Sequence, residues 1–344
     1  MNTLRTVLSA VIALALLSGC ATKETDESAA PLVRVRIEDA IPLKEAAKSI
    51  SGIPLSDSDA EHFPGDISRL VWKRDSIFII DGFKDRGLYL YNSDGKLVNS
   101  YTDKGNGPEE FLGMGDIFVT PSEIILLDTH LSNRIYLDRN LRFLRKEPTE
   151  WMAEHFYAVG NDSFWYDRGN VVGVDKNRGK LIYTSADERN VVLSVPEELE
   201  NITVASFNGF VPVRGDTILY LPPAEPRLYK CYDSKAEEFC RFDFGSRWPD
   251  YENMDPAKVF EFIQTVKGTG KVYSPNLLSD GSTFALSFRC DKNRYILLFG
   301  YDDLSSTRLL KIDAEDVESM GELVAVCDGE LVFGQPGKLI RIGV

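Results

Sequence analysis

Two aspartates and two arginines stand at matching places along this chain of 344 residues, and their side chains could bind a charged ligand. Asp81 and Asp128 each follow a short apolar run, and Arg86 and Arg134 come a few residues later. On one face of a protein, such groups could hold an anion or a sugar, and the carboxylates could hold a metal ion. The simpler interpretation is that each Asp caps its own turn and each Arg pairs locally.

Two aromatic residues in a polar segment, Trp248 and Tyr251, form a second candidate site. Exposed Trp and Tyr beside polar groups suit contact with a carbohydrate or a peptide. A short helix is expected directly afterwards, because Asp255-Pro256 resembles a helix start and apolar residues recur at helical spacing up to Val266. The two aromatic residues could instead fix this helix.

No residue pattern predicts a catalytic centre, a metal site or a cofactor. We expect His62, His130 and His155 in linkers or loops, and their spacing matches neither metal ligands nor a general base. The chain has no G-x-S-x-G motif, and no pair of carboxylates stands out for glycoside hydrolysis.

Cys231 and Cys240 flank the polar segment Asp233–Glu238. If this segment is a hairpin turn, the two cysteines lie opposite each other, and outside the cytoplasm they could form a disulfide. Two reduced, half-buried cysteines fit the pattern equally well.

These residues lie within a repeat that predicts the architecture. A polar turn followed by a short apolar run occurs six times, and the runs begin at Ile77, Ile124, Phe164, Ile218, Phe284 and Leu331. Each copy holds a hairpin and a third strand, and most copies hold a fourth. Four antiparallel strands repeated in this way are typical of a β-propeller, so we predict an all-β, six-bladed propeller.

The last copy lacks its fourth strand, because the chain ends at Val344. The segment Leu32–Ile37 alternates apolar and basic residues, which is the period of a strand. We therefore predict that this N-terminal strand closes the last blade. The expected helix after Asp255 is an insertion before blade five.

The first residues predict export and a lipid anchor. Residues 1–19 contain an apolar run that is too short to span a bilayer, which is typical of a signal peptide. Leu17–Cys20 matches a lipoprotein cleavage site, with Cys20 as the acylated residue. An ordinary secretory signal with a chance cysteine is the alternative. Residues 20–31 read as a flexible tether, and residues 32–344 as the propeller. The net charge of -14, with no basic run, excludes nucleic acid as a partner.

A resemblance adds to this interpretation. The segments Ile79–Asp81 and Leu88–Tyr91, followed by the G-x-G-P-x-E-[YF] pattern at Gly105–Phe111, resemble the six-bladed β-propeller lipoproteins of Bacteroidetes, relatives of NHL-repeat propellers. The resemblance implies a propeller and an outer-membrane lipoprotein, but no activity. Gly105–Phe111 is not a phosphate loop, since it lacks G-K-[ST] and Pro108 removes a donor. We expect a tight link between blades in which Glu110 accepts from backbone N–H groups.

Two functions fit these observations. The first is a non-enzymatic binding or scaffold protein of the envelope, held to the membrane by its lipid, with a glycan, a peptide or an envelope protein as partner. The alternative is a propeller hydrolase or lyase with an axial metal held by carboxylates such as Asp81 and Asp128, an inference from the fold alone.

Overall fold

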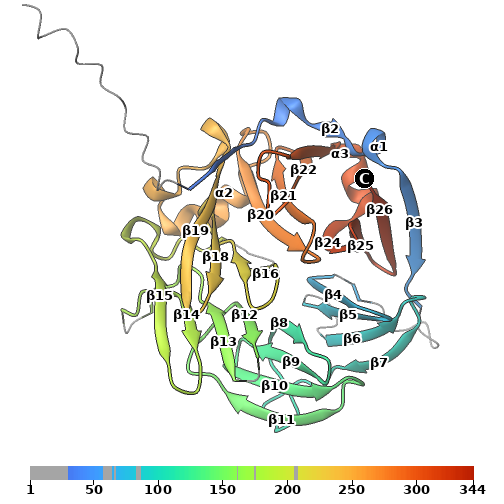
Figure 1. The fold of residues 1–344 in the computed structure, drawn as a ribbon, viewed down its shortest axis with the longest axis vertical. Coiled ribbons are helices and arrows are strands. Elements are labelled where there is room, and N and C mark those ends of the chain that lie inside the picture. The colour runs from blue at the N-terminus through green and yellow to red at the C-terminus, as the bar shows by residue number, and fades with distance from the viewer. Residues whose placement is uncertain are drawn as a thin grey trace, which may run out of the picture. The chain divides into compact units, whose positions relative to one another are not determined.

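The computed structural model describes residues 30–56, 64–65, 67–82, 87–160, 162–173, 176–204 and 208–344. Pro31–Val344 forms one compact unit of six β-sheets arranged around a central axis (Figure 1). The expected six-bladed propeller is therefore confirmed. Met1–Ala30 forms a separate unit, and the predicted signal peptide and Cys20 lie outside the described residues.

The first three blades each consist of four antiparallel strands. Blade one contains β4 (Arg69–Lys73), β5 (Ser76–Asp81), β6 (Gly87–Asn92) and β7 (Leu97–Tyr101). Blade two contains β8 (Met114–Val119), β9 (Glu123–Asp128), β10 (Asn133–Asp138) and β11 (Phe143–Pro148). Blade three contains β12 (His155–Val159), β13 (Ser163–Asp167), β14 (Gly179–Thr184) and β15 (Arg189–Ser194).

The last three blades each take one strand from the N-terminal segment. Blade four contains β16 (Phe210–Pro212), β17 (Ile218–Tyr220), β18 (Arg227–Tyr232), β19 (Lys235–Asp243) and β1 (Leu32–Arg34). Blade five contains β20 (Val272–Ser279), β21 (Phe284–Cys290), β22 (Asn293–Phe299), β23 (Arg308–Ile312) and β2 (Ile41–Pro42). Blade six contains β24 (Glu322–Cys327), β25 (Glu330–Gln335), β26 (Lys338–Gly343) and β3 (Ser49–Pro54).

Strand β5 shows why the blades stack face to face. Its side chains alternate between two cores, as the two-residue period of a strand requires. Phe78 and Ile80 pack with residues of blade two. Ile77 and Ile79 pack with residues of blade six. Both faces of the sheet are thereby buried, which explains the continuous apolar run in the sequence.

The last blade is closed by an N-terminal strand, but not by the one expected. β3 pairs with β26 in antiparallel fashion from Ser49–Gly343 to Pro54–Lys338. The predicted segment begins with β1, which instead pairs in parallel with the outer strand of blade four. Side chains of this segment do alternate between buried and exposed positions, since Val33 and Val35 are buried while Leu32 is exposed. The pattern predicted a strand correctly and its partner wrongly.

The N-terminal segment forms a belt along the outer strands of blades four, five and six (Figure 1). β1 lies along β19, β2 pairs in parallel with β23, and β3 completes blade six. A sheet edge with unpaired N–H and C=O groups is a site of aggregation. The belt covers three such edges.

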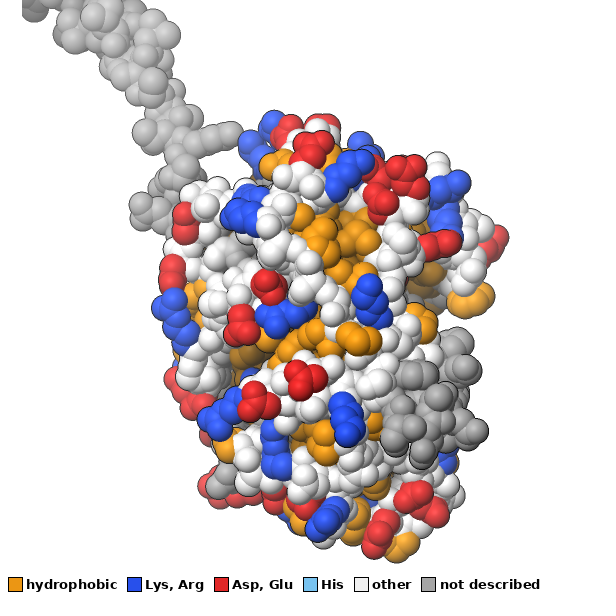
Figure 2. All heavy atoms as spheres, turned by 90° about the vertical axis from the view of Figure 1, so that its right-hand side faces the viewer, with side chains coloured by type: hydrophobic (Ala, Val, Ile, Leu, Met, Phe, Trp, Pro, Cys, Tyr) orange, Lys and Arg blue, Asp and Glu red, His pale blue; other side chains and the backbone are white. Residues whose placement is uncertain are grey.

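The expected helix before blade five is present. Asp255 caps a 3₁₀ turn at Pro256–Lys258 by accepting from the Ala257 backbone N–H, and α2 (Val259–Thr265) follows. Two helices were not predicted, α1 (Leu43–Ala46) and α3 (Ala314–Met320). In the part of the chain that the structure describes, no helix has the length and apolar character needed to cross a membrane. Figure 2 shows apolar side chains in bands between charged ones on one side of the molecule.

Of the two alternatives for Cys231 and Cys240, the reduced pair is present, since both cysteines are free. The hairpin turn is shorter than expected and is centred on Asp233 and Ser234, which both have positive φ. The register therefore places Ala236 opposite Cys231, and Leu228 opposite Cys240. The two buried thiols belong to different cores.

Candidate ligand sites on the propeller axis

The carboxylates of Asp81 and Asp128 accept hydrogen bonds from backbone N–H groups. Both side chains are fully buried at the ends of β5 and β9. Asp81 accepts from the Gly65 backbone N–H at 2.6 Å. Asp128 accepts from Leu112 and Gly113, which lead into β8, at 3.0 and 3.1 Å, and also from two N–H groups of the following turn. The simpler interpretation therefore holds for Asp128, whereas the contact of Asp81 is with the segment that precedes its blade.

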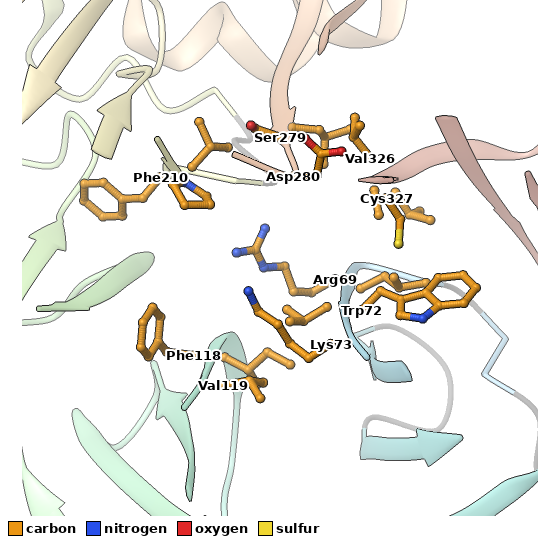
Figure 3. A pocket seen from close by; sticks show the side chains of 18 of the residues that line it. Arg69, Trp72, Lys73, Phe118, Val119, Phe210, Ser279, Asp280, Val326 and Cys327 are labelled. Atoms are coloured by element: carbon orange, nitrogen blue, oxygen red, sulfur yellow. The ribbon is translucent and has the colours of Figure 1, made fainter. Parts of the chain in front are cut away.

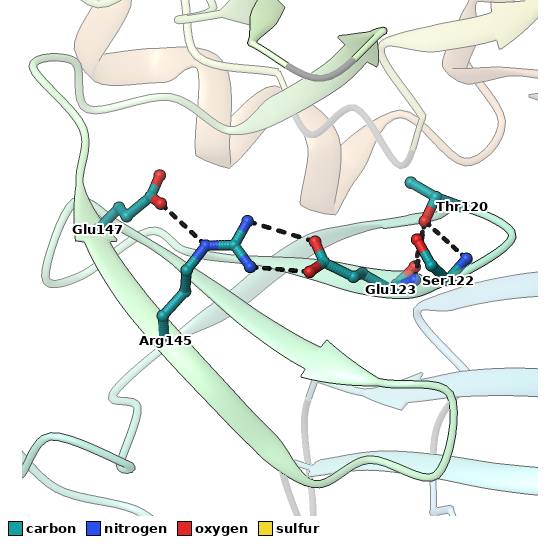
Figure 4. A network of polar contacts seen from close by, with 5 residues as sticks. All are labelled: Thr120, Ser122, Glu123, Arg145 and Glu147. Carbon is teal, nitrogen blue, oxygen red and sulfur yellow. Dashed lines mark hydrogen bonds and ion pairs between the residues drawn. The ribbon is translucent and has the colours of Figure 1, made fainter.

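Arg134 also pairs locally, while Arg86 lies outside the described residues. The guanidinium of Arg134 contacts the Glu147 carboxylate of the same blade at 3.2 Å and lies over the Phe164 ring at 4.0 Å. Glu147 also contacts Arg145, which forms a two-pronged pair with Glu123 at 2.8 and 3.2 Å (Figure 4). The described Asp and Arg side chains are therefore engaged in separate contacts, and Arg134 also reaches Phe164 of blade three.

Trp248 and Tyr251 hold the inserted helix in place. Trp248 stacks on Phe244 with ring centroids 5.3 Å apart. Tyr251 is 2% exposed and meets Trp248 and the Phe262 ring of α2 edge-on. These contacts support the alternative in which the two rings fix the helix, and they leave the buried Tyr251 ring little surface for a carbohydrate or peptide.

The Gly105–Phe111 segment is the expected link between blades one and two. The Glu110 carboxylate accepts from the Gly107 backbone N–H at 2.7 Å. A Cβ at Gly105, where φ is +154°, would lie 2.0 Å from a carboxylate oxygen of Glu110. Phe111 is fully buried against Tyr101. The glycines therefore make room for the glutamate in this link between blades.

A cavity of about 340 Å³ lies at the propeller axis, lined by the first strand of all six blades. Arg69 and Lys73 of β4 point into the middle of this axial cavity (Figure 3). Phe118 and Phe210 line one side, and Trp72 lines another. The axial cavity therefore combines cationic groups with aromatic walls.

Two acids, Asp280 and Asp328, also line the cavity, and both have partners other than Arg69 and Lys73. Asp280 accepts from Ser282, from the Thr283 N–H at 2.9 Å and from the Gly329 N–H at 2.7 Å. Burial opposes its ionisation, but these donors outweigh burial and lower the pKa of Asp280. Lys73 is exposed, and no ion pair of its ammonium group occurs within the described ranges. Its charge is available to a ligand.

Arg69 connects the axial cavity to a buried acid–base cluster. Its Nε lies 2.9 Å from Asp116 Oδ1, and Asp116 Oδ2 lies 3.6 Å from His155 Nδ1. Burial raises the pKa of Asp116, but Arg69 and His155 outweigh burial and lower it. Burial lowers the pKa of His155, but Asp116, with help from Asp167 and Glu154, raises it overall. Both shifts favour a charged pair.

Asp167 repeats the position of Asp81 and Asp128 at the end of the second strand of its blade. Its Oδ1 accepts from the Gly169 N–H and from the Tyr220 hydroxyl, both at 2.8 Å. Burial raises the pKa of Asp167 although His155 opposes this shift. This residue therefore links blades three and four.

Comparison with known protein families gives a match over most of the chain. A family model described as a 6-bladed beta-propeller, DUF5128, matches residues 24–320. The chain belongs to this family. A Bacteroides fragilis NCTC 9343 protein described as exported is 13% identical, with a TM-score of 0.71 over 91% of this chain and 99% of that chain. A DUF4221 member from Bacteroides vulgatus ATCC 8482 is 8% identical, with a TM-score of 0.57 over 86% of this chain and 96% of the other. No curated protein matches.

In this DUF5128 propeller, sequence reasoning missed the residues that meet at the axis. His155 was expected in a loop but begins β12 and is 4% exposed. Arg69 and Asp116 had no motif to mark them. Only Asp167 carried a signal, because it stands where Asp81 and Asp128 stand in earlier copies. Among the described residues, no three His, Cys, Asp or Glu side chains form a group that could hold a metal ion.

Proposed function

We propose that this DUF5128 protein is a lipid-anchored envelope propeller that binds a ligand at its axis without converting it chemically. The observation that supports the proposal is the convergence of Arg69 and Lys73 inside an aromatic-walled cavity of about 340 Å³ (Figure 3). A concave site with apolar walls and a few directed charges is the usual form of a small-ligand site.

The chemistry of the axial cavity selects an anion that carries an apolar group. A carboxylate would meet Lys73, while Phe118 and Phe210 would bury an aromatic or aliphatic body. The last residue of a peptide has a carboxylate and, when its side chain is apolar, an apolar body as well. The partner that fits best is therefore a peptide or envelope protein presenting an apolar C-terminal residue.

Isothermal titration with N-acetylphenylalanine tests this site, and its C-terminal amide is the matched control ligand. We expect the acid to bind, and the amide to bind roughly tenfold more weakly, because a charge-assisted contact is lost. Lys73→Glu should abolish binding of the acid. Lys235→Glu changes an exposed lysine in the β18–β19 hairpin and should leave binding unchanged. Equal binding of acid and amide, or full binding by Lys73→Glu, would contradict the proposal.

The lipid anchor is the second part of the proposal, and it depends on Cys20. A strain that expresses the full chain should incorporate labelled palmitate into the protein and hold it in the membrane fraction. Cys20→Ala should remove the label and release the protein. An unlabelled wild-type protein would leave an ordinary secretory signal as the explanation of residues 1–19.

The contacts of Asp128 argue against the alternative, a hydrolase or lyase with an axial metal. Its carboxylate faces four backbone N–H donors, and a metal ligand there would have to displace them. Asp81 also faces a backbone N–H group. Metal analysis of the purified protein is the direct check on this alternative.

A further inference from the structure

A second, smaller pocket lies at the other end of the axis, where blades five and six meet. Its volume is about 210 Å³, and its walls come from β20, β21, β22 and β24, together with Ser68 and Asn208. The axial cavity takes in the C-terminal end of β24, up to Cys327, whereas this polar pocket takes in its beginning, Glu322–Val324. The polar pocket therefore lies towards the opposite end of β24 from the ligand site proposed above, and Val324 lines both.

Two buried polar side chains face this pocket, and one of them has an oxygen without a hydrogen-bond partner. Asn208 is 4% exposed; its Nδ2 donates to Asn276 Oδ1 at 2.7 Å, but its own Oδ1 has no partner. Arg294 is 1% exposed, and its Nη2 lies 2.6 Å from a Glu322 carboxylate oxygen. Leaving a buried oxygen such as Asn208 Oδ1 unsatisfied is costly, and native proteins rarely do so without a reason. A ligand that donates to Asn208 would satisfy this oxygen.

The backbone that forms one wall of the pocket is irregular. The pairing of β20 with β21 shifts between Tyr273 and Asn276, and Ser274 within this bulge has a φ of +50°. A non-glycine residue with positive φ is strained, and such strain and bulges concentrate at binding sites. The bulge places Tyr273, Ser274 and Asn276 together in the pocket wall.

The charges around the pocket leave one positive charge in excess. Arg289 and Arg294 both pair with the Glu322 carboxylate, which Arg294 Nη2 approaches to 2.6 Å. The Glu322 side chain is 54% exposed, so it can turn towards solvent. A second carboxylate, supplied by a ligand, would complete the pairing of the two guanidinium groups. Glu322 is the acid in the pocket wall, and it is already shared, so an ammonium group would find no free partner there.

We propose that this pocket binds a small polyhydroxylated carboxylate, a sugar acid of one ring. The carboxylate would pair with Arg289 and Arg294, and a hydroxyl would donate to Asn208 Oδ1. The remaining hydroxyls would meet Asn276 and the Ser287 hydroxyl, which line the same pocket. The volume of about 210 Å³ is enough for a single sugar ring.

Titration calorimetry with D-glucuronate tests the inference, with D-glucose and acetate as ligands that each keep half of its chemistry. We expect D-glucuronate to bind and the two others to bind at least about tenfold more weakly, because each lacks one set of contacts. Acetate binding as tightly as D-glucuronate would indicate a simple anion site and overturn the sugar-acid assignment. The absence of D-glucuronate binding would overturn the whole inference.

Two variants add a sharper test. Asn208→Ala should weaken D-glucuronate binding about tenfold, since it removes the acceptor. Glu322→Gln should tighten binding several-fold, because it frees both guanidinium groups, an effect that loss of structure would not produce. Glu238→Gln is the matched control, since Glu238 pairs with Arg241 on the outer strand of blade four. Unchanged affinity in both pocket variants would contradict the inference. Lys73→Glu should not affect this site, so the two ligand sites can fail independently.

Discussion

Gly105 and Glu110 show how single residues fix the link between blades one and two. Gly105→Ala would place a Cβ against the Glu110 carboxylate at a φ of +154°. We expect a loss of roughly 2–3 kcal/mol in the free energy of unfolding, measured by urea denaturation. Gly160→Ala is the control, because Gly160 also has positive φ but has no atoms within 4 Å of an added Cβ. Equal losses in the two variants would show that the clash with Glu110 is unimportant.

Asp128 supports a second prediction at this scale. Asp128→Asn keeps the shape of the side chain but turns an amide donor towards backbone N–H groups that need an acceptor. Because the site is fully buried, we expect a loss of about 2 kcal/mol in stability. Asp138→Asn is the control: Asp138 accepts from the Asn140 and Arg142 N–H groups near the surface, where water can substitute. A loss at Asp128 no larger than at Asp138 would argue for a ligand-binding rather than a capping role.

At the scale of elements, the belt rests on alternate residues of β1. Val33 pairs with Phe242 of β19 in the same core and is 5% exposed, so Val33→Ala should cost about 2 kcal/mol in stability. Leu32→Ala, at a 55% exposed residue, should be neutral. A double-mutant cycle with Phe242→Ala should show a coupling energy of about 1 kcal/mol, whereas a cycle with Ile340→Ala in blade six should be additive. Coupling to Ile340 instead would restore the original assignment of Leu32–Ile37 to blade six.

The same elements show what sequence can predict and what it cannot. The repeat predicted the blades because each copy carries its own turns and apolar runs, and such signals are local. The partner of Leu32–Ile37 is not local: any exposed sheet edge accepts an amphipathic strand. The register of the Cys231 hairpin depends on a two-residue turn at Asp233 and Ser234. The sequence did not distinguish this turn from the polar residues that follow it. The axial residues come from different blades, and only the packing of neighbouring blades brings Arg69, Asp116 and His155 together.

At the scale of the whole molecule, the packing of blade on blade places titrating groups where they affect global stability. His155 faces Asp116, Asp167 and Glu154, and together they raise its pKa above the ordinary value of 6.5 despite burial. A raised folded-state pKa means that the stability from this charge is fully present below 6.5. It is lost as pH rises through the folded-state value.

Lowering the pH towards 6.5 should therefore increase the free energy of unfolding of the intact propeller, measured by urea denaturation at each pH. At more acid pH the trend should reverse in part. The pKa of Asp116 is lowered below 3.8, so its contribution is lost as pH falls through its folded-state value. His155→Gln should remove the dependence of the free energy of unfolding on pH above 6.5. His130→Gln changes an exposed histidine and should retain this pH dependence. If the free energy of unfolding varied with pH equally in both variants, the Asp116–His155 pair would not hold blades two and three together.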